Sequence, residues 1–204
     1  MISSRERRSL LIATTNPGKL REIEAILNGL PLELKTLRDS PAVPEPVENG
    51  QTFGENARLK ALHYAEATGE LTVAEDSGLV IDALDGAPGV HSARWHGTDY
   101  GVKFRKIKEL LANRGLTSSA ARFVCHLALA RDRRILYETE QTIEGRIADR
   151  PAGGEGFGYD PIFFYPPLSK TLAQLERDEK SRISHRGKAF FALREYLRRV
   201  TPNL

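Results

Sequence analysis

The sequence predicts a mixed α/β fold, with parallel strands early in the chain, antiparallel strands later, and two lobes around a cleft. Over residues 9–81, short apolar runs alternate with helical patterns, which is typical of strand–helix–strand units. Two long alternating segments follow at 122–130 and 135–147, and the polar stretch between them indicates an antiparallel hairpin. The 204 residues are enough for one cooperative unit, so we expect a single two-lobed domain.

The first predicted unit is a strand, a turn and a helix. Residues 9–14 form an apolar run typical of a buried strand, and residues 15–18 have the composition of a turn. A helix should begin at Lys19, because apolar residues recur from there at three- and four-residue spacing. These residues are Leu20, Ile23, Leu27 and Leu30. A second strand is predicted at 32–37.

A loop and a capped helix come next. Residues 41–50 contain three prolines and two glutamates, so no regular element can continue through them. Thr52 and Glu55 then form a capping-box pattern, which predicts a helix that runs toward Gly69.

An acidic pair follows the next apolar run. Residues 71–74 and 79–81 are short apolar runs, and Glu75-Asp76-Ser77-Gly78 stands between them. We interpret the runs as two strands. The acidic pair is therefore expected at a strand end.

The last third of the chain predicts two more helices and a glycine-rich loop. The first helix places Phe104, Ile107, Leu110 and Leu111 on one face and ends at Gly115, and the closing helix does the same with Phe190, Leu193, Leu197 and Val200. Between them, residues 153–161 form a glycine-rich loop before a short aromatic strand at 162–164.

Composition excludes several classes of protein. The apolar runs are far shorter than the roughly 20 residues that span a bilayer, and residues 1–8 are polar and basic. We therefore expect a cytoplasmic protein with a flexible N-terminal extension and no membrane partner. The formal charge of +3 is spread among 27 acidic residues, which suits a small anionic ligand better than nucleic acid. Cys125 lies in an alternating apolar run and is expected to be a buried strand thiol.

The first segment with chemical interest joins the first strand to its helix. It consists of Thr14, Thr15, Asn16, Pro17, Gly18 and Lys19. The first amide groups of a helix lack partners within the helix, so such a turn can bind an anion. The segment is not the common P-loop, because Leu20 replaces the Ser or Thr after the lysine. An ordinary turn with a surface lysine is the alternative interpretation.

Carboxylates form a second group, drawn from loops and a helix start. They are Glu45, Glu48, Glu55, Glu75 and Asp76. Mg²⁺ is usually held by one or two carboxylates together with phosphate oxygens and water, so this group suits a metal–phosphate substrate. No cysteine or histidine spacing supports zinc. As alternatives, Glu45 faces solvent and Glu55 caps a helix, whereas the adjacent acids Glu75 and Asp76 repel each other unless something compensates them.

The third group joins residues 156–160 to residues 180–186. Aromatic residues between glycines can stack on a flat ring, and Asp160, His185 and Arg186 could hydrogen-bond to a base or ribose. Alternatively, Phe157 and Tyr159 pack beneath the loop, and Ser184 only caps the last helix.

Taken together and in this order, the motifs resemble the inosine/xanthosine triphosphate pyrophosphatase family over nearly the whole chain. They are Ala13 to Lys19, Thr52 to Ala57, Ala74 to Leu79, Gly86 to Arg94, Gly156 to Pro161 and Ser184 to Gly187. The resemblance implies an elongated α/β sheet with flanking helices, a central nucleotide-binding cleft and a homodimer. It also implies hydrolysis of inosine, deoxyinosine and xanthosine triphosphates to the monophosphate and pyrophosphate, with Mg²⁺ as cofactor.

The resemblance assigns roles to individual residues. Asp76 is implied to be the proton acceptor and a metal ligand, with Glu48 as the second metal ligand. The triphosphate is assigned to Thr14, Thr15, Asn16, Pro17, Gly18 and Lys19. The remaining substrate contacts are assigned to Ser77, Phe157, Gly158, Tyr159, Asp160, Lys180, His185 and Arg186. The family more often has Asp where Glu75 stands and often has Gly at Thr15, which leaves open whether Glu75 contacts the metal.

Two alternatives remain at this point. A Maf-like pyrophosphatase would act on pyrimidine or methylated nucleotides, although the pair His185 and Arg186 argues against it. A non-enzymatic nucleotide- or RNA-binding protein would use the basic start of the chain, but it would not need acids beside a phosphate loop.

Overall fold

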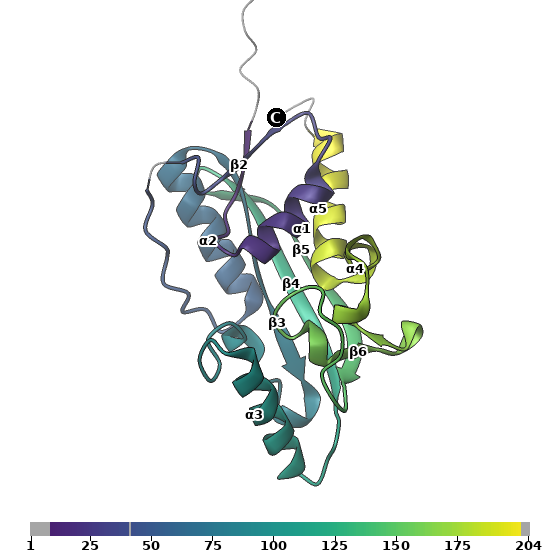
Figure 1. Cartoon of the computed structure of the whole chain (residues 1–204). Helices are drawn as coiled ribbons and strands as arrows, with labels where there is room; N and C mark the ends of the chain where they lie inside the picture. Colours follow the sequence, from purple (N-terminus) through teal and green to yellow (C-terminus); the bar gives the residue numbers. More distant parts are fainter. Residues whose placement is uncertain (1–8, 41, 201–204) are drawn as a thin grey trace, which may run out of the picture. The chain divides into compact units, whose positions relative to one another are not determined.

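The computed structural model describes residues 9–40 and 42–200 and confirms a mixed α/β fold (Figure 1). The predicted extension at residues 1–8 lies outside the described residues. The chain divides into two compact units: the first holds the chain up to Asp76, residues 126–140 and the chain from Ala189, and the second holds residues 77–125 and 141–188. The seven strands of the described residues are hydrogen-bonded in the order β2-β1-β3-β4-β5-β6-β7.

The strands are β1 (Ser9–Ile12), β2 (Glu33–Thr36), β3 (Leu71–Ile81), β4 (Ala120–Arg131), β5 (Arg134–Ile147), β6 (Phe163–Tyr165) and β7 (Lys170–Thr171). The α-helices are α1 (Pro17–Leu27), α2 (Phe53–Thr68), α3 (Tyr100–Ala112), α4 (Arg177–Ile183) and α5 (His185–Val200). β1 pairs in parallel with β2 and β3, whereas β6 pairs antiparallel with β5 and β7. The predicted change from parallel to antiparallel pairing is thus confirmed.

Helix α2 begins and ends where its capping residues predict. The Thr52 hydroxyl accepts a hydrogen bond from the Glu55 amide at 3.1 Å, and Gly69 closes the helix in the left-handed conformation with φ of 70°. The reciprocal bond of the capping box is displaced by one residue, because Glu55 accepts from the Gln51 amide at 2.7 Å.

Strand β3 differs from the prediction of two short strands. Residues 71–81 form one continuous strand, so the expectation that Glu75 and Asp76 lie at a strand end is wrong. Ser77 and Gly78 resemble a turn in sequence, but neighbouring strands supply the hydrogen bonds that keep the backbone extended. The neighbouring β1 nevertheless ends at Ile12, opposite Val73, so the acidic pair lies beyond the end of that strand.

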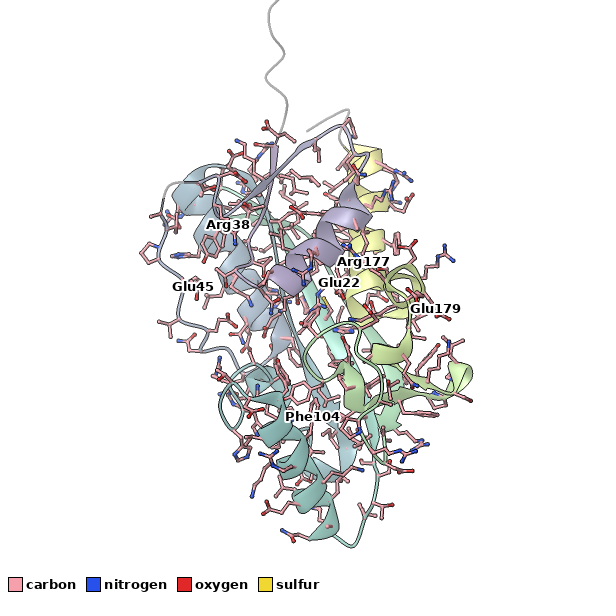
Figure 2. The ribbon with its side chains drawn as sticks, viewed as in Figure 1. Glu22, Arg38, Glu45, Phe104, Arg177 and Glu179 are labelled. Carbon is pink, nitrogen blue, oxygen red and sulfur yellow. The ribbon has the colours of Figure 1, made fainter. Side chains whose placement is uncertain are left out.

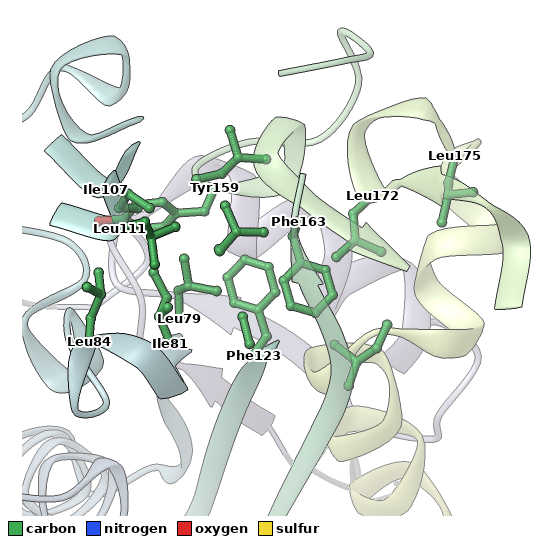
Figure 3. Packing of buried hydrophobic residues seen from close by; sticks show 14 residues of the cluster. Leu79, Ile81, Leu84, Ile107, Leu111, Phe123, Tyr159, Phe163, Leu172 and Leu175 are labelled. Atoms are coloured by element: carbon green, nitrogen blue, oxygen red, sulfur yellow. The ribbon is translucent and has the colours of Figure 1, made fainter. Parts of the chain in front are cut away.

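The core of the second unit surrounds the aromatic residues of β4 and β6 (Figure 3). Phe123 and Phe163 pack with ring centroids 4.8 Å apart, and Tyr159 belongs to the same cluster. From α3, the predicted apolar face contributes Ile107 and Leu111, both fully buried. Burial of each large side chain contributes about 1.5–3 kcal/mol, so this core holds the glycine-rich loop in place.

The first unit has its own core, formed where α2 covers the strands. The alanines of α2, among them Ala57, Ala61 and Ala65, are fully buried, which allows the helix to approach the sheet closely. Figure 1 shows α1 beside α5, where Arg194 donates to the Ile26 carbonyl at 3.0 Å.

The helix α4 and the short strand β7 were not predicted from sequence. Helix α4 has the sequence RDEKSRI, which lacks the apolar periodicity that marks a helix. Within residues 9–40 and 42–200, no helix is long and apolar enough to cross a membrane. Cys125 is buried in β4, as predicted.

Candidate functional site

The turn after β1 is a closely hydrogen-bonded N-cap. The Asn16 side chain accepts from the amides of Gly18 at 2.8 Å and Lys19 at 3.1 Å, and the Asn16 amide donates to the Thr14 hydroxyl at 3.2 Å. The Gly18 and Lys19 amides, which lack partners within the helix, are therefore already paired with the N-cap side chain of Asn16. The exposed side chains of Thr15 and Asn16 and the half-buried Lys19 are the groups that this turn offers to an anion.

Lysines compensate the acidic pair of β3. Glu75 is buried and pairs with the Lys19 ammonium at 3.0 Å. Asp76 is buried as well and accepts from the Lys60 ammonium at 3.3 Å and from the side-chain amide of Asn56 at 3.1 Å. The sequence had indicated that two adjacent acids need compensation, and Lys19 and Lys60 provide it.

Lys60 also joins Asp76 to Glu48. Its ammonium lies 3.3 Å from one oxygen of each carboxylate, so the two residues expected to hold a metal contact the same cation. We name Lys19, Glu48, Asn56, Lys60, Glu75 and Asp76 the acidic cluster. All six belong to the first unit.

Burial and neighbouring charges act in opposite directions on the pKa values of Asp76 and Lys60, the two charged partners at the centre of this cluster. Burial raises the pKa of Asp76, although the Lys60 ammonium and the side-chain amide of Asn56 act against that rise. Burial lowers the pKa of Lys60, but the carboxylates of Asp76, Glu48 and Glu75 outweigh it, and the net shift of its pKa is upward. Lys60 therefore remains an ammonium ion, while Asp76 is a stronger base than an ordinary aspartate.

The other acids of the predicted group lie outside the cluster. Glu45 is exposed on the loop before α2 (Figure 2), and Glu55 is exposed and caps the helix. Among the described residues, no three or more histidine, cysteine, aspartate or glutamate side chains are grouped closely enough to hold a metal ion. A metal here would have to complete its coordination with substrate oxygens and water.

Lys60 was not predicted from the sequence, and Asn56 was given no role there. Both residues lie on α2 at a spacing of four, which puts them on one helical face, and that face meets β3. The available signal was a lysine among alanines on the buried side of an amphipathic helix. The Asn56 side chain also accepts from the Gly50 amide at 2.9 Å, so it ties the loop that carries Glu48 to α2.

A second cluster forms around Phe157 in the second unit. The buried Asp160 accepts from the Phe157 amide at 2.8 Å and from the Lys180 ammonium at 2.7 Å. Lys180 and Arg186 also lie over the half-buried Phe157 ring, 4.8 and 5.3 Å from its centroid. We name Ser77, Phe157, Asp160, Lys180 and Arg186 the Phe157 cluster; Arg186 donates to the Ser77 hydroxyl at 2.9 Å. Its aromatic surface and cations suit a flat ring that carries acceptor oxygens.

His185 and Arg186 form the first turn of α5. The Ser184 hydroxyl accepts from the Gly187 amide at 3.0 Å, which confirms the alternative that Ser184 caps this helix. The His185 ring stacks on Phe123, with centroids 4.7 Å apart and planes 7° apart. The orientation of the imidazole is thus set by packing as well as by the helix.

Tyr159 is buried in the core of the second unit, whereas Phe157 in the same loop is half-buried. Its side chain is 3% exposed and its hydroxyl donates to the Ser92 carbonyl at 3.0 Å. Burial raises the pKa of Tyr159, so the hydroxyl remains a donor. Contact between Tyr159 and a ligand would therefore come from its backbone. Position 156 in the same loop requires glycine, because φ of Gly156 is 75° and a Cβ atom there would lie 2.3 Å from an Asp160 oxygen.

Gly187 should tolerate no side chain. A Cβ atom there would lie 1.7 Å from the Ser181 carbonyl oxygen, so Gly187→Ala must push α4 away from the start of α5. We expect a loss of about 2–3 kcal/mol in the free energy of unfolding, measured by urea denaturation. Gly69→Ala is an informative comparison because its Cβ atom meets nothing within 4 Å and only the φ of 70° opposes it. Equal stability of Gly187→Ala and the wild type would contradict the close packing of Gly187 against Ser181.

Fold and clusters together define an α/β protein with two sets of polar residues. The acidic cluster and the turn before α1 suit an anionic group, and the Phe157 cluster suits a flat polar ring. Comparison with known proteins makes the assignment specific. The chain belongs to the Ham1 family, whose model matches residues 10–196.

Relatives and solved structures agree with this membership. The chain is 49% identical over 180 residues to the dITP/XTP pyrophosphatase of an Exiguobacterium species, with 88% of this chain and 92% of the relative covered. It is 45% identical over 190 residues to the dITP/XTP pyrophosphatase of Geobacter sulfurreducens, with coverages of 92% and 96%. The solved structure of a HAM1 protein from Coxiella burnetii is similar at a TM-score of 0.87 and 38% identity, covering 94% of this chain and 99% of that one.

Proposed function

We propose that this protein is a Mg²⁺-dependent pyrophosphatase that hydrolyses non-standard purine nucleoside triphosphates to the monophosphate and pyrophosphate. Its relatives, which the chain matches over most of their length, carry the name dITP/XTP pyrophosphatase. The structural observation that carries the proposal is the environment of Asp76, a buried carboxylate with a raised pKa that shares Lys60 with Glu48. A buried base of this kind suits removal of a proton from water.

The residues present fit Mg²⁺. Glu48 and Asp76 offer hard oxygen ligands, and two carboxylates are the number that usually holds Mg²⁺ beside substrate phosphates. Mg²⁺, when bound there, would neutralise charge on the phosphate oxygens. Lys60 now lies between the two carboxylates, so it would share them with the metal or turn toward the phosphates.

The chain's own residues account for the remaining chemistry. Lys19 and the turn before α1 bind the phosphates through side-chain donors and the positive end of the helix. Asp76 takes a proton from a water molecule while the oxygen of that water bonds to the α-phosphorus. The bond from that phosphorus to the bridging oxygen breaks, and pyrophosphate leaves. The negative charges of the triphosphate are then divided between two molecules, so the repulsion between them is relieved.

The Phe157 cluster supports recognition of the base. Phe157 offers a half-exposed ring for stacking, and Arg186 and His185 supply donors for the carbonyl oxygen at position 6 of hypoxanthine or xanthine. Adenine carries an amino group at that position, so the same donors would be left unsatisfied. The residues of this cluster belong to the second unit, and Ser77 follows Asp76 directly in the chain.

A substrate panel tests the proposal. ITP, dITP, XTP, ATP, GTP and UTP are each incubated with the enzyme, and the monophosphate is separated by ion-exchange chromatography, a readout that needs no metal-dependent coupling enzyme. We expect kcat/KM for ITP and XTP to exceed that for ATP by about 100-fold or more, since unpaired buried donors are costly. Removal of Mg²⁺ with EDTA should abolish turnover.

Three results would count against the proposal. Formation of the diphosphate would show cleavage at another phosphorus. Preference for UTP would favour the Maf-like alternative. Equal rates on ITP and ATP would remove the role of the Phe157 cluster in selectivity.

A further inference from the structure

Lys103 on α3 is a lysine that the proposed reaction does not use, and it is completely buried. Its ammonium donates to two consecutive backbone carbonyls, those of Ser92 at 3.0 Å and Ala93 at 2.7 Å. Among the described residues, none of its contacts is a carboxylate. Burial lowers the pKa of Lys103, as expected for a cation whose partners are neutral.

Aromatic rings complete the surroundings of this ammonium. It lies 4.3 Å from the centroid of Tyr100 and 5.6 Å from that of Tyr159. The two tyrosine rings meet edge to face at 5.1 Å, and Phe104, labelled on α3 in Figure 2, packs against Tyr159 at 6.2 Å. A buried lysine would be expensive without such partners, and a methionine of similar length would fill the same space without the cost.

The carbonyl of Ser92 joins Lys103 to Tyr159, which directly precedes Asp160 of the Phe157 cluster in the chain. It accepts from the Lys103 ammonium and also from the Tyr159 hydroxyl at 3.0 Å. The Ser92 hydroxyl is held too, since it accepts from the Leu79 amide at 2.9 Å and donates to the Gly89 carbonyl at 2.6 Å. Ser92 is therefore fixed through both its backbone and its side chain.

Tyr159 carries this constraint into the loop that holds Phe157 and Asp160. The loop closes on itself, because the Asp160 amide donates to the Phe157 carbonyl at 3.3 Å and the Asp160 side chain accepts from the Phe157 amide. Gly158 lies against Tyr100, where an added Cβ atom would come within 3.5 Å of the hydroxyl. The Tyr100 and Tyr159 rings thus support this loop, and the Lys103 ammonium lies against both rings.

We propose that Lys103 is a positioning residue for base recognition: with Ser92, it fixes Tyr159 and thereby the backbone of residues 156–160, on which the Phe157 ring and Asp160 depend. This inference rests on the proposed function for its meaning in catalysis. The Lys103 ammonium is occupied by the carbonyls of Ser92 and Ala93 and by the tyrosine rings, so we assign it no direct contact with substrate or metal. Its contribution should therefore appear in substrate binding and base selectivity rather than in the rate of the chemical step.

Two variants test this role in the full-length enzyme. Lys103→Met removes the ammonium with little change in volume, and Tyr159→Phe removes only the hydroxyl that shares the Ser92 carbonyl. For each, we expect KM for ITP to rise about 10-fold with kcat changed less than about threefold, the size expected for loss of one hydrogen bond to or beside a charged group. The ratio of kcat/KM for ITP to that for ATP should fall by a similar factor.

The double variant sharpens the test. Because both side chains donate to one carbonyl, the combined effect on KM should be clearly different from the sum of the two single effects, expressed as free energies. Lys106→Met is the matched control: Lys106 is on the same helix, pairs with Glu109 at 2.8 Å and faces solvent in part, so KM and selectivity should not change.

Hydrogen exchange of the ligand-free protein separates this inference from the proposed function. Backbone amides of residues 156–160 should exchange about 10-fold faster in Lys103→Met than in the wild type, and at wild-type rates in Lys106→Met. The inference is overturned if the exchange of this segment, KM and the ITP-to-ATP ratio all stay at wild-type values in Lys103→Met. If that variant does not fold, wild-type values of the same three quantities in Tyr159→Phe overturn it equally. Failure of the wild type to prefer ITP would contradict the proposed function alone, because the exchange measurement requires no substrate.

Discussion

Asp76→Asn should lower pyrophosphate release from ITP by about 100- to 10,000-fold, the range expected when a general base is removed. The amide keeps the shape of the side chain and can still interact with Asn56, but it cannot take a proton from water. The measurement is kcat for formation of the monophosphate, at saturating ITP and Mg²⁺. ITP binding, measured by calorimetry, should persist.

Folding stability should not fall in this variant, and the sign follows from the pKa. Burial raises the pKa of Asp76 in the folded chain, so ionisation of the carboxylate at neutral pH costs stability relative to a neutral group. Lys60 retains Glu48 as a partner. Asp149→Asn serves as the control because Asp149 is exposed, and it should keep full activity. An Asp76→Asn enzyme with wild-type kcat would remove Asp76 from its role.

Lys60→Met should be the second most damaging change, with kcat/KM for ITP reduced about 10- to 100-fold at neutral pH. The ammonium contacts both Glu48 and Asp76, and hydrogen bonds to charged groups are worth about 1.5–3 kcal/mol. Loss of Lys60 leaves the two carboxylates to repel each other.

This variant should also change the pH profile. Activity requires ionised Asp76, so the rate falls as pH decreases through the pKa of that residue. Lys60 holds the pKa of Asp76 below the value that burial alone would produce, and its removal should therefore move the acidic limb to higher pH. Arg58→Met provides a control on the same helix, because Arg58 is exposed and pairs with Glu138 instead. An acidic limb at the wild-type pH in Lys60→Met would show that Lys60 does not influence the base.

Local sequence signals predicted most helices and strands. The capping residues Thr52 and Gly69 set the limits of α2 to within a residue, because caps act over three or four neighbouring residues. Signals failed where hydrogen bonds come from distant parts of the chain. Ser77 and Gly78 resemble a turn, yet pairing with neighbouring strands keeps β3 continuous. Helix α4 was missed because its sequence is almost entirely polar.

The candidate site divides in the same way. Sequence patterns and the family resemblance singled out the residues of both clusters except Lys60 and Asn56, and the adjacency of Glu75 and Asp76 showed that positive charge had to be near them. Sequence could not show that Lys60 would provide it for Asp76 and Glu48, that Asn16 would occupy the amides of its own helix start, or that the Tyr159 side chain would turn into the core.

By itself, the sequence determined the fold class, the family and the residue types that carry the chemistry, because periodicity, caps and motifs are properties of neighbouring residues. Only the tertiary structure decided which cation meets which acid, and which loop rests on the buried Lys103. Those pairings depend on the face that a helix turns toward the sheet and on contacts between residues far apart in the chain. Burial then raised the pKa of Asp76, the property on which the proposed reaction depends.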